Sequence, residues 1–200
     1  MKPKTTQLVY TCLALVLFGY EASADDGAKV VDVKAGAMTL KVPATWKPVK
    51  VTSEFREAQF SVPGAKDDDE SADLVVYHFG GPTGGIKANV DRWVGQFEEK
   101  GRKVEMMRGQ SQQGDYILAE ISGTWNKPVG PPFAQKTVKT PGSRVIGIIV
   151  ITGKDDARDY YFIKFSGPEA LVKIQADALR SAIGVNLDSE KPFDLKNAEN

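Results

Sequence analysis

The sequence predicts an α+β domain: a largely antiparallel β-sheet with two main helices packed on it. Segments with the apolar patterns of strands follow one another in runs, without the regular strand–helix alternation of parallel α/β folds. Two stretches repeat apolar residues at helical spacing, one in the middle of the chain and one near its end. Because no internal repeat or linker divides the sequence, we expect a single domain.

Three strands are expected before the first helix. Residues 38–42 and 58–62 alternate apolar and polar side chains, as half-buried strands do, and each run ends at a proline. Residues 74–79 are apolar on both faces apart from His78, which is typical of an interior strand. A glycine-rich turn at 80–85 then interrupts the strand pattern.

The first helix is predicted to follow that turn. Its apolar stripe consists of Ile86, Val90, Trp93, Val94 and Phe97. These positions follow the spacing i, i+4, i+7, i+8 and i+11, so they share one face of a helix. The charged residues lie outside that face. Gly101 is the expected stop.

The second half predicts strands at 103–107, 115–125, 145–151 and 160–165. The third is the most apolar run and should be central, and the fourth should pair with it as a hairpin. Between the second and third of these strands, residues 126–141 carry several prolines and lysines and are predicted to form a long loop.

A second helix is expected near the C-terminus. Ser166 and Glu169 have the spacing of a capping box, with Pro168 in the first turn. The predicted apolar arc consists of Leu171, Ile174, Ala178, Leu179, Ala182 and Ile183. Gly184 should end the helix, and the polar tail after Asn186 is expected to be frayed.

Residues 1–24 have the organisation of a secretory signal peptide. Lys2 and Lys4 precede an apolar run at 8–20, and the small-x-small tripeptide 22–24 follows. The run is shorter than the roughly 20 residues of a membrane-spanning helix. Cys12 lacks the preceding small residue of a lipoprotein site. We therefore expect cleavage after Ala24 and an exported chain, periplasmic or extracellular, without stable membrane insertion.

The expected organisation is a signal peptide at 1–24, a lead-in at 25–36, the α+β domain at 37–185 and a polar tail at 186–200. The chain has 26 basic and 26 acidic residues, and the signal peptide removes few of them. A near-neutral chain has no long-range attraction to nucleic acid. Because Cys12 is the only cysteine, the processed chain has no disulfide or thiolate.

No motif predicts a catalytic, cofactor-binding or metal-binding residue. His78 is the only histidine, and one histidine without cysteine does not complete a usual zinc or copper set, so we interpret it as structural or surface-exposed. The acidic run at 67–70 lacks the ligand spacing of an EF-hand and reads as a solvated loop. The 80–85 turn lacks the lysine of a phosphate loop. Its glycines are nevertheless candidate contact residues: Gly80, Gly81, Gly84 and Gly85.

The segment 125–133 is the strongest candidate for binding a partner. Its candidate contact residues are Trp125, Lys127, Pro131, Pro132 and Phe133. Prolines restrict the unbound segment, so less conformational freedom is lost on binding. The alternative is that Trp125 and Phe133 pack under the edge of the sheet as a satellite of the core.

Several segments together resemble the PsbP/DcrB-like class of exported α+β domains. They are the early strand with its tryptophan (38–46), the passage from Phe-Gly-Gly (79–81) into Asn-Val-Asp-Arg-Trp (89–93), and the hairpin at 145–165 that leads into a helix. The same segments are similar to uncharacterised, planctomycete-like secreted proteins. The resemblance implies an antiparallel sheet flanked by helices and, since members of the wider class act mainly as accessory or docking proteins, a non-catalytic role. It supplies no site residues.

The leading hypothesis is an exported, non-enzymatic accessory or docking protein of the bacterial cell envelope, which binds a partner protein or complex through its loops. The alternative is a small-ligand carrier with a pocket between sheet and helix, which would take an apolar or anionic ligand. A hydrolase with dispersed carboxylates is the third hypothesis. No cofactor is expected.

Overall fold

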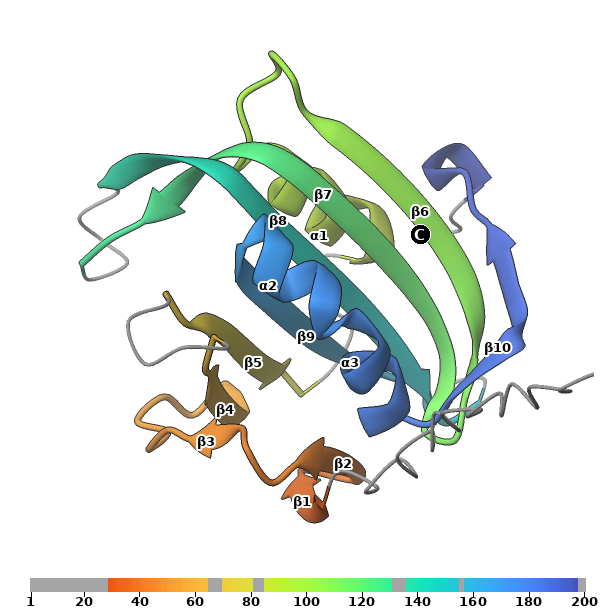
Figure 1. The fold of residues 1–200 in the computed structure, drawn as a ribbon. Coiled ribbons are helices and arrows are strands. Elements are labelled where there is room, and N and C mark those ends of the chain that lie inside the picture. Colours follow the sequence, from red (N-terminus) through yellow and green to blue (C-terminus); the bar gives the residue numbers. More distant parts are fainter. Residues whose placement is uncertain (1–28, 65–69, 81–84, 131–135, 155–156, 198–200) are drawn as a thin grey trace, which may run out of the picture.

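A curved antiparallel sheet of eight strands forms the centre of the computed structural model (Figure 1). The structure describes residues 29–64, 70–80, 85–130, 136–154 and 157–197. The strand order is β10-β6-β7-β8-β9-β5-β4-β3, and a separate two-stranded sheet pairs β1 with β2. This arrangement confirms the predicted α+β class.

The large sheet consists of β3 (Lys47–Pro48), β4 (Arg56–Val62), β5 (Ala72–His78), β6 (Lys103–Ser111), β7 (Gly114–Pro128), β8 (Thr137–Thr152), β9 (Asp159–Pro168) and β10 (Val185–Pro192). The small sheet consists of β1 (Val30–Ala35) and β2 (Met38–Pro43). The helices are α1 (Gly85–Val94), α2 (Glu169–Ile174), α3 (Ala176–Ala182) and the short 3-10 helix η3 (Leu195–Asn197). None of the helices in the described part of the chain has the length and apolar content that a membrane crossing requires.

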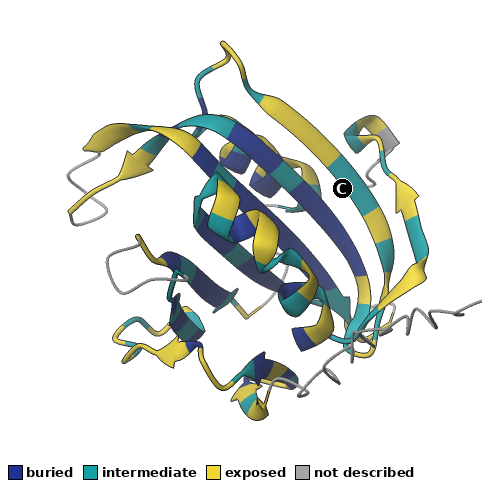
Figure 2. Cartoon of the chain, viewed as in Figure 1, coloured by how far each residue is buried: buried dark blue, intermediate teal, exposed yellow. Residues whose placement is uncertain are grey.

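The two faces of the large sheet carry separate hydrophobic cores. One face packs against α2, α3 and the small sheet through residues such as Leu118 and Ile148. The opposite face, which we call the α1 face, packs against α1 through neighbours such as Ala119 and Ile149. Because successive strand residues point to opposite faces, the central strands are buried on both sides, as Figure 2 shows.

A glycine seats α1 on its face of the sheet. The indole of Trp93 lies directly over Gly147 in β8, where an added Cβ would stand 2.3 Å from the ring. No other residue leaves room for that ring, because protein interiors are close-packed. The lack of a side chain at Gly147 therefore determines where α1 crosses the sheet.

The predicted loop at 126–141 is wrong. The ladder between β7 and β8 continues outward from Trp125, paired with Thr140, to Pro128, paired with Thr137. The strands shift register there, because Pro141 and Gly142 together lie opposite one residue of β7. Such a bulge accommodates a proline, which has no N–H to donate to the ladder. The result is a two-stranded arm that extends beyond the sheet in Figure 1.

The ends of the domain also differ from expectation. Val30–Ala35, placed in the lead-in, forms β1 and pairs with β2. Val185–Pro192, expected mostly within a frayed tail, forms the edge strand β10, which pairs with β6. As an edge strand, β10 pairs with one strand only and covers little apolar surface. Its side chains are therefore mostly polar and give no apolar strand pattern in the sequence.

The second helix is divided in two at Gln175, which is not helical (ψ 0°) and accepts a hydrogen bond from the Trp46 indole at 3.3 Å. The break leaves Ile174 in solvent, 76% exposed, rather than in the predicted apolar arc. The predicted capping box is also absent, because β9 remains paired with β8 as far as Pro168, and Pro168 is the N-cap.

A largely buried ionic network joins both C-terminal helices to the sheet. The carboxylate of Glu120, in the middle of β7, accepts hydrogen bonds from Arg144 of β8 at 2.7 Å and Arg180 of α3 at 3.0 Å. Arg144 also donates to Glu169 of α2 at 3.0 Å. One acidic side chain thus faces two arginines, each of which has a second carboxylate partner.

The network continues to the edge strand. Arg180 donates to Glu190 of β10 at 3.1 Å, and the Tyr116 hydroxyl donates to the same carboxylate at 2.7 Å. Burial opposes the charge on Arg180, but its hydrogen bonds to both carboxylates prevail, so its pKa lies above its ordinary value. Burial, then the bond to Glu190, raises the pKa of Tyr116.

We expect Glu120→Gln to lower the free energy of unfolding by about 2–4 kcal/mol, because it removes the charge that two largely buried arginines share. Urea denaturation with an unchanged slope is the measurement. The control is Asp91→Asn, which breaks an exposed ion pair with Lys87 on α1 and should cost less than about 0.5 kcal/mol. Equal losses for the two variants would contradict this role of Glu120.

Candidate functional site

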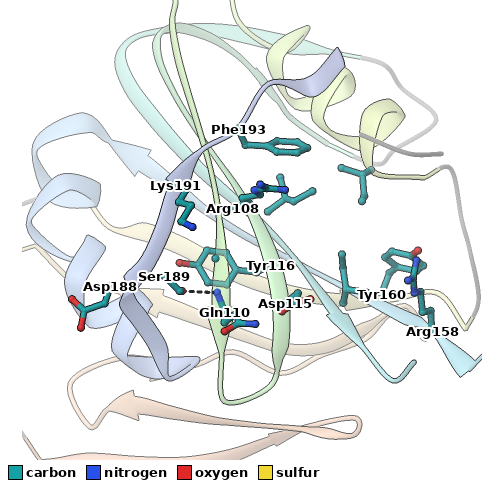
Figure 3. A pocket seen from close by; sticks show the side chains of 14 residues that line it. Arg108, Gln110, Asp115, Tyr116, Arg158, Tyr160, Asp188, Ser189, Lys191 and Phe193 are labelled. Carbon is teal, nitrogen blue, oxygen red and sulfur yellow. Dashed lines mark hydrogen bonds between the residues drawn. The ribbon is translucent and has the colours of Figure 1, made fainter. Parts of the chain in front are cut away.

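A pocket of about 840 Å³ lies on the α1 face of the sheet, between the first turn of α1 and the C-terminal segment. Its lining includes Ile86, Arg108, Ile117, Ile151, Arg158, Tyr160, Lys191 and Phe193. In Figure 3, Arg108, Lys191 and Phe193 stand on one side of the pocket, and Tyr160 with Arg158 stands on the other.

The strands of the sheet bring the floor of this pocket together. Arg108 of β6 pairs with Ile117 of β7, and Ile151 of β8 pairs with Tyr160 of β9. Directly opposed residues of antiparallel strands point to the same face, so these side chains form a continuous floor. The floor is therefore apolar and aromatic at its centre and cationic at its rim.

The edge strand supplies one wall. Lys191 of β10 stands opposite Arg108 of β6, and the backbone N–H of Gln110 donates to the hydroxyl of Ser189 at 2.8 Å. Between Asn186 and Lys191 the strand bulges away from β6. The bulge turns Glu190 toward Tyr116 on the far face and leaves Lys191 at the rim of the pocket.

The pocket carries more positive than negative charge. Arg108, Arg158 and Lys191 line it together with Asp115 and Asp188. Within the described ranges, none of these five side chains makes an ion pair. Arginine guanidinium groups bind carboxylates and phosphates with paired hydrogen bonds. Exposed arginines beside an aromatic floor can therefore bind an anion that has an apolar body.

Trp125, the first candidate from the sequence, lies in the core: its side chain is 6% exposed. Its ring stacks on Phe97 with centroids 6.3 Å apart, and its indole N–H donates to Gln96 at 3.3 Å. The amino group of Lys164 lies 4.8 Å from the ring centroid. Of the two interpretations of Trp125 given above, partner contact or packing against the core, its position corresponds to packing.

The other candidates are not brought together in the described structure. Lys127 is exposed on the arm, 5.9 Å from the Trp125 ring. Gly80 follows β5, and Gly85 begins α1; both have positive φ, at 67° and 63°. Five candidates lie outside the described residues: Gly81, Gly84, Pro131, Pro132 and Phe133. Partner binding by this set therefore stays a prediction.

His78 lies between two carboxylates that are distant in the sequence. Its Nε2 lies 2.7 Å from Asp159 of β9, and its Nδ1 lies 3.5 Å from Glu57 of β4. The ring also stacks on Tyr161, with centroids 4.4 Å apart. Since both ring nitrogens face carboxylates, this placement is that of a structural histidine that links three strands. No cluster with the composition of a metal site occurs in the described ranges.

The pocket residues could not be predicted from the sequence because they lie on, or directly beside, separate strands. Arg108 gave one local signal: it lies on the same face of β6 as Met106, so a cation occupies a position where the pattern calls for an apolar residue. Arg158, which directly precedes β9, and Lys191 gave none, because each sits in a charged segment with the composition of an exposed loop. The pairing of the strands that carry or adjoin these residues brings them together.

No family model and no curated protein matches the chain. Among solved structures, it is similar to PA94, a protein of unknown function from Pseudomonas aeruginosa, with a TM-score of 0.40 and 12% identity over 76% of this chain and 92% of that one. It is also similar to PsbP (CyanoP) from Synechocystis sp. PCC 6803, with a TM-score of 0.40 and 12% identity over 78% of this chain and 86% of that one. One of these two structures is a PsbP, the class named in the sequence resemblance. Neither likeness transfers a function or a site residue.

The environment of Lys164 predicts a pH dependence of stability. Burial, then the positive charge of Arg92, lowers its pKa from the ordinary 10.5 to about 8. Between these values the unfolded chain keeps the proton and the folded chain does not, so stability rises with pH. Relative to Lys164→Met, the wild type should gain about 2–3 kcal/mol from pH 8 to 10.5.

Urea denaturation across this pH range measures the gain. Lys173→Met, which removes an exposed lysine of α2, is the matched control and should keep the rise of the wild type. An identical rise in Lys164→Met would show that another group is responsible.

Proposed function

We propose that the chain is an exported, non-enzymatic binding protein whose pocket on the α1 face takes an organic anion with an apolar body. The observation that carries the proposal is the set of Arg108, Arg158 and Lys191 around a floor of apolar and aromatic side chains. Export rests on the signal-like residues 1–24. A binding role, rather than general-base catalysis, is supported by His78, whose two nitrogens already face carboxylates.

The size and shape of the pocket fit this class of ligand. Its volume of about 840 Å³ lies within the range of pockets that hold small organic molecules. Ile117 and Ile151 offer apolar contact on the floor, while Tyr160 and Phe193 offer ring surfaces on either side. A long alkyl body would lie on the floor, and its anionic group would meet the arginines at the rim.

Dodecanoate tests this proposal, with dodecanol as its uncharged counterpart. We expect dodecanoate to bind the folded chain and raise its thermal midpoint, because a ligand of the native state stabilises it. Arg108→Gln/Arg158→Gln should weaken binding about 100-fold or more, because it removes two charge-assisted hydrogen bonds that each contribute about 1.5–3 kcal/mol. Isothermal titration calorimetry gives the affinities.

Lys41→Gln/Lys173→Gln is the matched control, because it removes two exposed cations outside the pocket. It should leave the affinity for dodecanoate unchanged. Equal weakening of dodecanoate binding in both double variants would indicate non-specific charge attraction. Equal affinity for dodecanol and dodecanoate would show that the arginines do not recognise the anionic group.

A docking function is the second candidate, and the β7–β8 arm favours it. The arm extends beyond the sheet, and its Val129 and Val138 are 37% and 53% exposed. An ion pair from Lys139 to Glu98 ties it to the segment after α1. A surface that is already ordered loses little conformational freedom on binding. We propose an envelope protein or complex as its partner.

Recovery of the C-terminally tagged chain from the envelope fraction of its own cells tests docking and export together. We expect the recovered chain to begin at Asp25 and to carry one reproducible partner. Val129→Ser/Val138→Ser should lose that partner with stability changed by less than about 0.5 kcal/mol, because both side chains are exposed. Val104→Ser, on β6 and 41% exposed in the wild type, should retain it. Retention by the arm variant would exclude the arm as the contact.

A further inference from the structure

A second cavity borders the other end of α1. Its volume is about 390 Å³, and it lies between the last turn of α1, the segment that follows it, and strands β5 and β9. Its lining consists of Tyr77, Phe79, Arg92, Trp93, Gln96, Phe162 and Lys164. It shares no lining residue with the larger pocket, which Ile86 of the first helical turn borders. The two cavities are therefore separate sites.

Four of these residues are aromatic, and the rings of three of them, Tyr77, Phe79 and Phe162, form a connected wall. Tyr77 and Phe79 stack with centroids 6.1 Å apart and an interplanar angle of 4°. Phe79 also meets Phe162 at 5.6 Å with rings inclined by 59°. Both arrangements are among those that aromatic pairs prefer. A planar aromatic guest would find ring faces and edges here.

Lys164 brings a cation to this wall without an acid to balance it. It extends from β9 on the α1 face, in register with Gly147. Its amino group donates to the side-chain oxygen Oε1 of Gln96 at 2.7 Å and lies over the Trp125 ring. In the described part of the chain, both of these partners are uncharged, and no carboxylate pairs with this amine.

Arg92 adds a second positive charge on the side of α1. Its guanidinium donates to Asn89 at 2.6 Å, and its charge disfavours protonation of Lys164. Three further titratable groups border the site: Tyr77 of β5, Arg56 of β4, which lies over the Tyr77 ring, and Lys127, which lies over the Trp125 ring. None of these groups is a carboxylate. An anion is therefore the component that would balance the site.

We propose that this cavity binds an aromatic carboxylate, with the carboxylate between Lys164 and Arg92 and the ring against Tyr77, Phe79 and Phe162. The amine keeps two N–H donors beyond its bond to Gln96, and charge-assisted hydrogen bonds of this kind are among the strongest in proteins. The cavity volume accommodates one or two fused rings. This inference does not depend on the function proposed for the larger pocket.

Isothermal titration calorimetry with 2-naphthoate tests the site, and 2-naphthalenemethanol is the uncharged counterpart. We expect 2-naphthoate to bind the wild type and Lys164→Met to weaken it about tenfold or more. Binding should also weaken as the pH rises above about 8, where Lys164 loses its proton. Arg108→Gln/Arg158→Gln should leave 2-naphthoate binding unchanged, which separates this site from the dodecanoate pocket.

Three results would overturn the proposal: absence of 2-naphthoate binding to the wild type at millimolar concentration, equal affinity of Lys164→Met, or equal affinity for the alcohol. Urea denaturation of Lys164→Met verifies its fold. Lys164→Arg provides a further check, because it keeps the charge and should retain binding at pH 9, where the wild type loses it. Failure of dodecanoate to bind would leave these outcomes unaffected.

Discussion

The carboxylate of Glu120 is the constraint on which the arrangement of the C-terminal half depends. It lies on a central strand and is only 17% exposed, so its charge requires close partners. Arg144 and Arg180 supply them from β8 and α3. Because each arginine also binds a second acid, α2 and β10 are drawn into the same network. Removal of one charge from a buried network leaves the others uncompensated. The network therefore holds α2, α3 and β10 in one arrangement on the sheet.

This network also shapes the larger pocket from the opposite side of the sheet. Glu190 is held by Arg180 and Tyr116 on the face of α2 and α3. Its neighbour Lys191 therefore returns to register with Arg108 at the rim of the pocket. The bulge in β10 makes this possible, because it lets adjacent residues serve different faces. The structural anchor and the candidate binding wall are thus parts of one short strand.

Helix α1 separates the two candidate sites on its own face. The indole of its Trp93 rests on Gly147. If the helix moved toward either site, the indole would clash with a neighbouring side chain or leave a void over the glycine. Each site combines arginine or lysine with aromatic rings, and among the described residues no acid pairs with the amine of the smaller one. The chain as a whole is neutral, with equal numbers of basic and acidic residues. Local accumulation of positive charge on this face, rather than net charge, is what would select anions.

Periodicity of the sequence by itself determined the fold class and most strands, because burial of one or both strand faces leaves a pattern in consecutive residues. It also placed Val90, Trp93 and Phe97 in the core. The outer arm, β1 and β10 required tertiary structure, since their pairing depends on partners and bulges rather than on apolar pattern. The candidate sites did so too: Arg108, Arg158 and Lys191 are far apart along the chain. The pairing of the strands that carry or adjoin them brings them to one pocket. The sequence shows how many charged residues the chain has. The pairing of distant strands decides which of those residues lie close to an opposite charge and which do not.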